Sequence, residues 1–321
     1  MATPALRALR EAHPNARIVL EGRPLFADLV EGLPTIDAFL PDPGRGLRRA
    51  IGRARRLRAE RFDWAVLLPD SVRAAVAPFL ARIPVRAGYA RDAIRRALLT
   101  HGLEPPRQDG KRLPISMIER YLRIVRTLGC PDPPLRLEVP VRDEARKRIA
   151  RRLEAAGLRD PFLLVTPGAS FGSSKLWPVE HFASACDGIA REHGLRSVLA
   201  PGPGEEGIAR AIAAAMKTRC LTLDDPPTTL AELAALVERC RLLLTNDTGP
   251  RQIAVALDRP VVVLMGPTDP RHTEHLLERQ RVLREEVPCS PCHYKVCPID
   301  HRCMTRLSPE RAVAAAAELL A

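Results

Sequence analysis

The chain has 321 residues and a formal net charge of +12 at pH 7. Hydrophobic residues make up 46% of it, but no apolar run reaches the roughly 18 residues of a transmembrane helix, so we expect a globular protein with about two domains. Its polar, helix-forming start lacks the apolar core of a signal peptide, which predicts a cytoplasmic protein. The positive charge favours anionic partners, whereas an aromatic content of 4% argues against nucleic acid.

The first half of the chain alternates short apolar runs with amphipathic stretches, the pattern of parallel βαβ units. A helix opens the chain, and no strand is predicted before it. The stripe from Ile118 to Leu128 predicts a helix that stops at Gly129, and residues 91–113 have no period and predict a long loop. The other strands are predicted over 17–20, 36–40 and 64–68, and the other helices over 24–31, 45–60 and 71–82.

The helix predicted over 45–60 is rich in arginine. Its apolar stripe would consist of Leu47, Ile51, Ala54 and Leu57. A solvated outer face and contact with an anionic membrane surface are both consistent with this pattern. The arginines in or next to this helix are Arg45, Arg48, Arg49, Arg53, Arg55, Arg56, Arg58 and Arg61.

A proline-rich stretch over 130–140 predicts a linker between two domains, 1–140 and 141–321. After it, strands and helices alternate regularly to the end of the chain, which predicts a complete doubly wound parallel sheet. The strands are predicted over 162–166, 197–200, 220–223, 242–244 and 261–265, and the helices over 142–156, 179–192, 204–217, 228–239, 250–257 and 308–320.

A polar turn follows the three leucines of 242–244, which predict a buried strand. Asp247 or Thr248 is placed to cap the next helix, which Gly249 and Pro250 open. Ligands of open α/β sheets bind at such strand ends, and a helix N-terminus suits phosphate. A capped turn without a ligand needs the same residue types, so that alternative stays open.

The strand over 162–166 leads into a loop of glycine and serine that ends at Lys175, one of only five lysines among 50 basic residues. The loop hydroxyls, N–H groups and lysine charge suit phosphate, although the residue order of a Walker loop is absent. The alternative is an ordinary surface loop. After the next strand, Glu205 and Glu206 are placed to bind ribose hydroxyls or simply to begin a helix.

The eight cysteines form two groups. Four are dispersed near apolar segments and are expected to be buried small side chains: Cys130, Cys186, Cys220 and Cys240. The other four lie within 15 residues, and their spacing is compatible with zinc or an iron–sulfur cluster, with a disulfide pair, or with reduced structural cysteines. This cluster is Cys289, Cys292, Cys297 and Cys303, interleaved with His293 and His301.

Several short motifs are spread over almost the whole chain, and together they are specific enough to indicate a protein family, although no single one is. They are Ala2-Thr-Pro-Ala-Leu-Arg-Ala-Leu, Ala65-Val-Leu-Leu-Pro-Asp-Ser, Ile83-Pro-Val-Arg-Ala-Gly-Tyr, Pro167-Gly-Ala-Ser with Lys175-Leu-Trp-Pro, Thr245-Asn-Asp-Thr-Gly-Pro and Gly266-Pro-Thr-Asp-Pro. With these motifs, the chain resembles the ADP-heptose:lipopolysaccharide heptosyltransferases of glycosyltransferase family 9, especially the heptosyltransferase II type. The resemblance implies an α/β GT-B fold, in which two Rossmann-like doubly wound parallel-sheet domains face each other across a cleft.

The resemblance also assigns roles to the residues singled out above. The C-terminal domain would hold the ADP-sugar, and the N-terminal domain would meet the acceptor. Ser170 and Lys175 would contact the diphosphate, and Glu205 or Glu206 would contact the ribose. The phosphate and sugar end would be lined by Asp247, Thr248 and Gly249.

The sequence departs from the family pattern in two places. The family begins with a strand and a Gly-Asp loop whose Asp is the general base, so the catalytic residue here is unknown. We expect Met1 to be an internal methionine that follows about 10–20 residues carrying that strand and loop, which the upstream DNA would test. Gln252 stands where the family usually has His, and it can hydrogen-bond a phosphate or sugar without carrying charge. Arg251 lies beside it.

The resemblance predicts an inverting transferase that moves heptose from ADP-heptose to the inner core of lipopolysaccharide. No Asp-x-Asp metal site stands out, so no cofactor is expected to be required. The basic surface suits a lipid-anchored acceptor and peripheral contact with the inner face of the inner membrane. The alternatives are a nucleotide-sugar-binding homologue without turnover, which the missing base and Gln252 favour, and a metal-stapled nucleic-acid binder.

Overall fold

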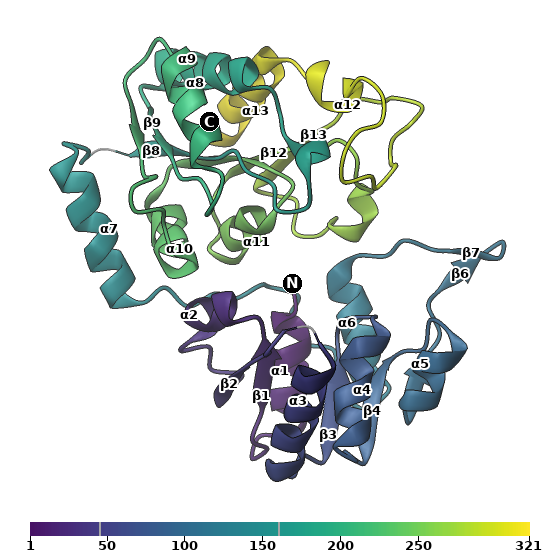
Figure 1. Ribbon diagram of the computed structural model, residues 1–321. Coiled ribbons are helices and arrows are strands. Elements are labelled where there is room, and N and C mark those ends of the chain that lie inside the picture. The colour runs from purple at the N-terminus through teal and green to yellow at the C-terminus, as the bar shows by residue number, and fades with distance from the viewer. Residues whose placement is uncertain (45, 160) are drawn as a thin grey trace. The chain divides into compact units, whose positions relative to one another are not determined.

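The computed structural model describes residues 1–44, 46–159 and 161–321, which form two compact units (Figure 1). The first unit comprises Met1–Arg136 and Arg271–His275. The second unit comprises Leu137–Pro270 and Leu276–Ala321. Both units alternate strands with helices along the chain, as the sequence predicts.

The first unit contains two small parallel sheets and a short antiparallel ribbon. One sheet pairs β1 with β2, the other has the order β3-β4-β5, and the ribbon pairs β6 with β7. In the described part of the chain, β1 and β3 each have one edge without a partner strand, so the strand expected before the first helix stays a prediction. The strands are β1 (Val19–Gly22), β2 (Ala38–Pro41), β3 (Trp64–Leu67), β4 (Val85–Tyr89), β5 (His101–Leu103), β6 (Arg107–Gln108) and β7 (Lys111–Arg112).

The predicted helices of the first unit are present in the predicted order, and α5 is an additional helix. The helix α1 packs against α6, and α3 packs against α4. They are α1 (Thr3–Ala12), η1 (Pro24–Phe26), α2 (Ala27–Val30), α3 (Leu47–Ala59), α4 (Val72–Leu80), α5 (Ala93–Leu98) and α6 (Met117–Arg126).

One stretch of the first unit that was expected to be a long loop is regular. The prediction for 91–113 is wrong, because α5, β5, β6 and β7 lie within it. The reason is Arg95, which takes the place of an apolar core residue and is 0% exposed. Its guanidinium donates to the carbonyl oxygens of Tyr89 (2.6 Å), Pro69 (2.8 Å) and Ser71. A helix anchored by arginine lacks the apolar stripe from which sequence analysis recognises it.

The arginine-rich helix α3 is present, but one residue of its predicted apolar stripe is exposed. Ala54 and Leu57 are buried, whereas Ile51 is 40% exposed. Arg45, which was predicted to lie in this helix, falls outside the described residues.

Two arginines of α3 bind a carboxylate within the first unit. Arg53 and Arg56 donate to the side chain of Glu21 on β1, at 2.5 and 3.3 Å. These arginines therefore stabilise the packing of α3 on its own sheet. Contact of this helix with a membrane stays a prediction.

The second unit is built on a six-stranded parallel sheet with the order β10-β9-β8-β11-β12-β13. All strands predicted for this half are present, and β13 is an additional edge strand. The order reverses between β8 and β11, the switch point at which doubly wound sheets bind ligands. The strands are β8 (Phe162–Thr166), β9 (Arg196–Leu199), β10 (Cys220–Thr222), β11 (Leu242–Asn246), β12 (Val261–Leu264) and β13 (Gln280–Leu283).

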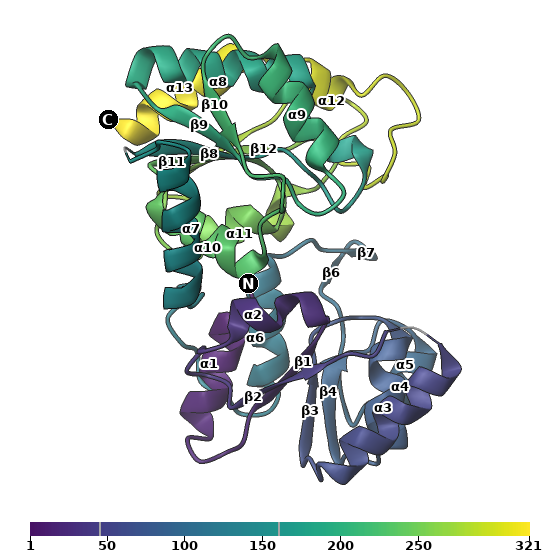
Figure 2. The same ribbon diagram turned by 60° about the vertical axis from the view of Figure 1, so that its left-hand side comes forward.

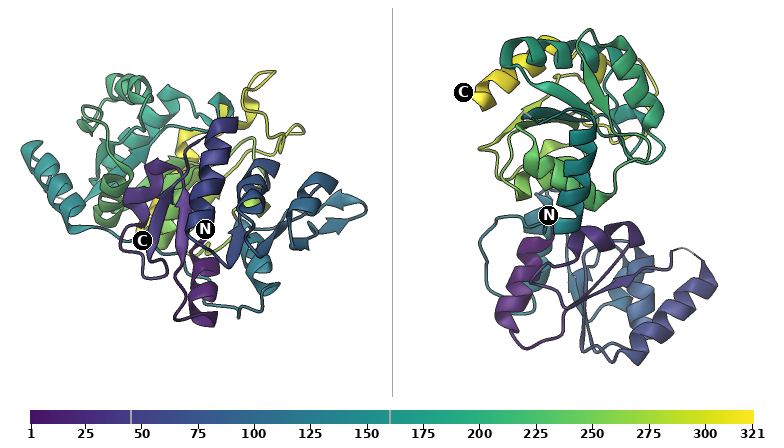
Figure 3. Two further views of the ribbon diagram at one scale, coloured as in Figure 1. Left: turned by 60° about the horizontal axis from the view of Figure 1, so that its bottom comes forward. Right: turned by 90° about the vertical axis from the view of Figure 1, so that its left-hand side faces the viewer.

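Helices cover both faces of this sheet, as Figure 2 and the right-hand view of Figure 3 show. The helices α8, α9 and α13 pack together on one face, and α7, α10 and α11 pack together on the other. The α-helices are α7 (Asp143–Ala155), α8 (Val179–His193), α9 (Glu206–Ala215), α10 (Leu230–Arg239), α11 (Gly249–Ala256), α12 (Arg302–Thr305) and α13 (Pro309–Leu320). The short 3-10 turns are η2 (Ser173–Lys175) and η3 (Pro270–His272), and η3 continues from Pro270 of this unit into residues assigned to the first unit.

The core of the second unit follows from alternation along its central strands. Every residue of β8, β11 and β12 is buried. Leu163 and Val165 belong to one core cluster with residues of α8, α9 and α13, because alternate side chains of a strand point to the same face. Burial on both faces explains the continuous apolar runs in the sequence, and it fixes the strand ends where the polar loops begin.

The dispersed cysteines are mostly core residues. Cys130, Cys186 and Cys240 are buried as predicted, whereas Cys220 lies partly exposed on the edge strand β10. Burial raises the pKa of the Cys186 thiol to about 12, so this side chain stays protonated at neutral pH. No helix in the described part of the chain combines the length and apolar composition that a membrane span requires.

Candidate functional site

The carboxyl ends of β8 and β11 lie side by side at the switch point. Thr245 pairs in register with Thr166, and the Thr166 hydroxyl donates to the Thr245 hydroxyl at 2.6 Å. One residue further on, the Asn246 amide donates to the carbonyl oxygens of Pro167 (2.6 Å) and Gly168 (3.3 Å). These polar bonds tie together the two loops that the sequence singled out.

A buried cluster of charges bridges the two loops. The Lys175 ammonium donates to a carboxylate oxygen of Asp247 at 2.9 Å and to its carbonyl oxygen at 2.6 Å. The Arg251 guanidinium, one turn into α11, donates to the other carboxylate oxygen at 3.0 Å. Lys175 is 9% exposed, Asp247 7% and Arg251 1%. Two cations therefore share one carboxylate, and the three side chains together carry a charge of +1.

The environment of Asp247 keeps its carboxylate ionised. Burial by itself raises its pKa, but the charge and hydrogen bond of Lys175, the charge of Arg251 and the hydroxyl of Thr268 together lower the pKa below its ordinary value. Thr268 donates to the carboxylate at 3.0 Å. Asp247 therefore acts as an anchor for two cations, and its carboxylate oxygens already accept several hydrogen bonds.

Two further residues of this cluster were not found from the sequence. Gln280, at the start of β13, accepts a hydrogen bond from Arg251 Nε at 2.8 Å and is 4% exposed. Thr268 belongs to the Gly266-Pro-Thr-Asp-Pro motif, so a signal for it existed, whereas nothing in the sequence placed Gln280 beside Arg251. The two residues orient the charged groups from the β12 side of the sheet.

The remaining predicted residues surround this cluster at different depths. Ser170 is exposed on the loop after β8, Thr248 is half-buried, and Gly249 is exposed as the first residue of α11. The prediction that a side chain caps α11 is wrong: Thr248 is the N-cap residue, but its hydroxyl donates back to the Asn246 carbonyl oxygen at 3.3 Å. The N-terminus of α11 is therefore not capped by its own threonine. Gln252 lies half-buried in the first turn of the helix.

Glu205 reaches the same strand ends from the neighbouring loop. It is the N-cap residue of α9, and its carboxylate accepts a hydrogen bond from the Gly202 N–H at 3.0 Å. A Cβ at Gly168 would lie only 1.6 Å from that carboxylate, so a larger residue there would displace the Glu205 side chain. Glu206 instead accepts from the Gly204 N–H, which lowers its carboxyl pKa. Of the two glutamates, Glu205 is thus the one placed against the loop that follows β8.

The clustered cysteines are free thiols in the structure. Burial, followed by the charges of Cys289, Cys292 and Cys297, raises the pKa of Cys303 to about 11. All four thiols are free, and in the described residues no group of three or more His, Cys, Asp or Glu is arranged to hold a metal ion. Cys303 is buried whereas Cys289 is exposed. Of the alternatives open for these cysteines, the described geometry matches reduced thiols, and a zinc or iron–sulfur site at them stays a prediction.

The arrangement of the charged cluster suits an anionic ligand. A helix N-terminus that the side chain of its N-cap residue does not cap, a net positive cluster and a glycine-rich loop meet at the carboxyl ends of two central strands. Unpaired helix N–H groups and the positive end of the helix dipole attract phosphate groups. These features are typical of α/β folds that bind nucleotides, and by themselves they indicate no particular activity.

Comparison with solved structures gives the fold class. A glycosyl transferase family 9 structure from Veillonella parvula DSM 2008 matches with a TM-score of 0.83 and 23% identity, over 99% of this chain and 92% of that chain. E. coli ADP-heptose lps heptosyltransferase II matches with a TM-score of 0.79 and 26% identity, over 99% and 94% of the two chains. The fold is therefore GT-B-like, as predicted.

Sequence comparison identifies the family. The family model described as glycosyltransferase family 9 (heptosyltransferase) matches residues 50–302. The chain belongs to this family. The lipopolysaccharide heptosyltransferase 2 of Escherichia coli strain K12 is 30% identical over 225 residues, which cover 66% of this chain and 62% of that relative.

Proposed function

We propose that this chain is a heptosyltransferase that transfers heptose from ADP-heptose to the inner core of lipopolysaccharide with inversion at the anomeric carbon. The family and the names of its relatives support the donor and the acceptor class. The observation that carries the proposal is the Lys175–Asp247–Arg251 cluster at the switch point of the second unit. Its net positive charge lies where a doubly wound sheet binds the phosphates of a nucleotide.

In this proposal the cluster stabilises the leaving group. As the bond between heptose and ADP breaks, negative charge grows on the β-phosphate, and preorganised cations lower the energy of that transition state. Asp247 uses two of the three N–H donors of Lys175, and the third is proposed to bind a phosphate oxygen. The N-terminus of α11, with Thr248, Gly249 and Gln252, would contact the phosphate and sugar.

The loop after β8 and its neighbour would bind the remainder of the donor. Ser170 is exposed on the glycine-rich loop, where its hydroxyl is proposed to contact the diphosphate. Glu205 lies against Gly168 of this loop, and its carboxylate is proposed to accept hydrogen bonds from the ribose hydroxyls. The ribose would thus be held beside the strand that carries the phosphate loop.

We also propose that the two halves of the chain bind different substrates. We assign donor binding to 141–321, because the whole charged cluster lies in the second unit. The acceptor is assigned to 1–140, where exposed arginines such as Arg48, Arg49 and Arg55 on α3 suit a phosphorylated, lipid-anchored sugar at a membrane surface.

The test is release of ADP by purified protein supplied with ADP-heptose and a lipopolysaccharide core acceptor. The proposal predicts one ADP for each heptose transferred, and NMR of the product should show the inverted anomeric configuration. Tight binding of ADP-heptose without turnover would instead support a nucleotide-sugar-binding homologue. Failure to bind ADP-heptose at all would contradict both functions.

A further inference from the structure

The cysteine-rich segment, residues 289–303, holds one residue of the loop after β8 from three directions. The Ser174 N–H donates to the Lys295 carbonyl oxygen at 3.0 Å, and the Ser174 hydroxyl donates to the Tyr294 carbonyl oxygen at 2.5 Å. The imidazole Nε2 of His301 lies 2.7 Å from the Ser174 carbonyl oxygen. Ser174 is 2% exposed and directly precedes Lys175, so these bonds fix the backbone from which the lysine extends.

The backbone of the segment also approaches the start of the turn η2. At Gly172, where φ is +154°, a Cβ would lie 2.2 Å from the Lys295 carbonyl oxygen. Only glycine allows this approach, because any side chain would push the segment away. The contact at Gly172 and the bonds to Ser174 grip the turn on both sides of Ser173.

The same segment is anchored at its other end to the loop after β12. The Ser290 hydroxyl donates to the Gly266 carbonyl oxygen at 2.7 Å, and the Cys292 N–H donates to the Pro267 carbonyl oxygen at 3.0 Å. A Cβ at Gly266 would lie 3.0 Å from the sulfur of Cys303. The segment therefore connects the loops that follow β8 and β12, the two strands that flank β11.

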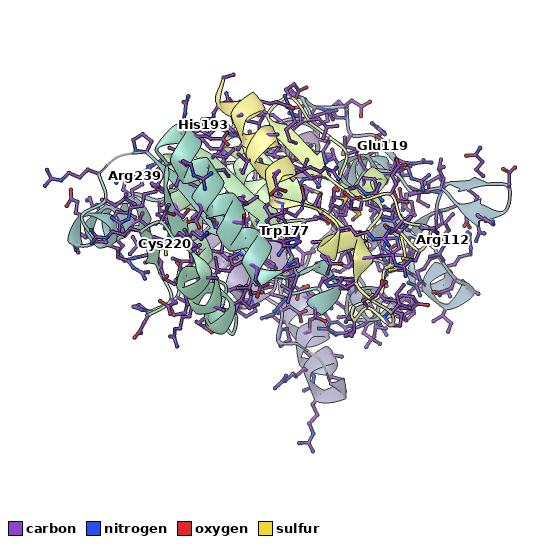
Figure 4. The ribbon with its side chains drawn as sticks, turned by 90° about the horizontal axis from the view of Figure 1, so that it is seen from above. Arg112, Glu119, Trp177, His193, Cys220 and Arg239 are labelled. Carbon is purple, nitrogen blue, oxygen red and sulfur yellow. The ribbon has the colours of Figure 1, made fainter. Side chains whose placement is uncertain are left out.

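The chain just after the segment is fixed to the core close to the same turn. Trp177, which is labelled in Figure 4, donates from Nε1 to the Leu307 carbonyl oxygen at 2.9 Å. The N–H of His301 donates to the Cys297 sulfur at 3.3 Å. The imidazole of His301 is thereby presented to Ser174 by a short stretch that is itself held at both ends.

We propose that the cysteine-rich segment is a clamp that positions Lys175 for the donor diphosphate, and that His301 is its positioning residue. The inference rests on the proposed function, because it assigns a role in donor binding. His301 does not touch the donor in this account. It acts through Ser174, and displacement of the turn would move the Lys175 ammonium away from Asp247 and from the phosphate.

The chemistry of the His301 bond makes the clamp independent of histidine charge. A carbonyl oxygen only accepts, so Nε2 must carry the proton. The neutral tautomer protonated at Nε2 and the imidazolium ion both have that N–H, so protonation of His301 leaves the bond intact. The clamp is therefore distinct from a pH switch, and Gln, whose side-chain amide can donate from a similar position, should replace His301 in part.

The experiment compares three variants of the whole chain, His301→Ala, His301→Gln and His293→Ala. His293 is a matched control, because it belongs to the same segment, is exposed, and has a φ of +57° against +58° for His301. The first readout is hydrogen exchange of the 172–176 amides without ligand. The second is the Kd for ADP, measured by calorimetry.

The clamp predicts faster exchange at 172–176 in His301→Ala, with partial restoration in His301→Gln and no change in His293→Ala. Loss of one hydrogen bond should raise the Kd for ADP about three- to ten-fold in His301→Ala, less in His301→Gln and not in His293→Ala. Unchanged exchange in His301→Ala would overturn the clamp. Failure of every protein, wild type included, to bind ADP would instead contradict the proposed function. The exchange data would still show whether His301 holds the turn at 172–176.

A second substitution approaches the clamp from the opposite side. Gly172→Ala places a methyl group against the Lys295 carbonyl oxygen. It should therefore accelerate hydrogen exchange of the 172–176 amides and raise the Kd for ADP. If Gly172→Ala folds and neither quantity changes, the segment does not position the turn. Agreement between the two variants would exclude an effect confined to the imidazole of His301.

Discussion

At the scale of single residues, Asp247 decides whether the candidate site is held together. Lys175 and Arg251 are buried with it, and a buried cation without a counter-ion is expensive. Asp247→Asn should therefore reduce the free energy of unfolding by about 3–5 kcal/mol. The measurement is denaturant unfolding at pH 7. Asp258→Asn is the matched control, because its exposed pair with Arg279 at 3.5 Å should contribute less than about 1 kcal/mol.

The same residue predicts a dependence of stability on pH. The pKa of Asp247 is lowered in the folded protein, so its stabilisation is complete above the unfolded pKa of about 3.9 and is lost as pH falls through the lower folded value. The difference in unfolding free energy between wild type and Asp247→Asn should therefore be constant above about pH 5 and shrink in more acidic solution. If this difference in unfolding free energy stayed constant well below the unfolded pKa, the carboxylate would not be stabilised by its cations.

Sequence reasoning selected Lys175 and Asp247 separately but did not predict that they bind each other. Their contact depends on β8 lying next to β11, and strand order is a property of the sheet rather than of either motif. The role of Arg251 was underestimated for the same reason, because its second partner, Gln280, begins an edge strand that the sequence did not reveal. The residue types at the site were therefore predictable, whereas their pairing was not.

At the scale of elements, α5 is the clearest case in which local pattern fails. Arg95 supplies the buried anchor of this helix. We expect Arg95→Ala to destabilise the first unit by about 3 kcal/mol, because three carbonyl oxygens lose a charged donor. Thermal unfolding measures the effect. Arg96→Ala on the same helix is the control, because Arg96 is exposed and pairs with Glu104 at the surface. Equal destabilisation by both variants would contradict the role of Arg95.

Elements with ordinary physical signals were predicted well. The strands β8, β11 and β12 are continuous apolar runs because they are buried on both faces. The strand β4 was not predicted, since Arg86 interrupts its short sequence. In both β4 and α5, arginines bind backbone carbonyl oxygens inside the first unit: Arg86 Nε donates to the Leu98 carbonyl oxygen at 2.8 Å. In so arginine-rich a chain, charge is a poor guide to exposure.

At the scale of the whole molecule, the candidate donor site lies within one unit. The Lys175–Asp247–Arg251 cluster, Glu205 and the cysteine-rich segment all belong to the second unit. Nucleotide binding can therefore be measured without knowing the acceptor or the catalytic base. Binding of a nucleotide and turnover can therefore be tested separately.

The most direct measurement is calorimetric titration of the whole chain with ADP, comparing wild type, Lys175→Ala and Lys217→Ala. Lys217 is exposed in the same unit and controls for the loss of one positive charge. Loss of a charged hydrogen bond should raise the Kd for ADP about ten- to a hundred-fold in Lys175→Ala, while Lys217→Ala should bind ADP as wild type does. Absence of ADP binding to wild type, or equal affinity in the two lysine variants, would contradict a phosphate site at the switch point.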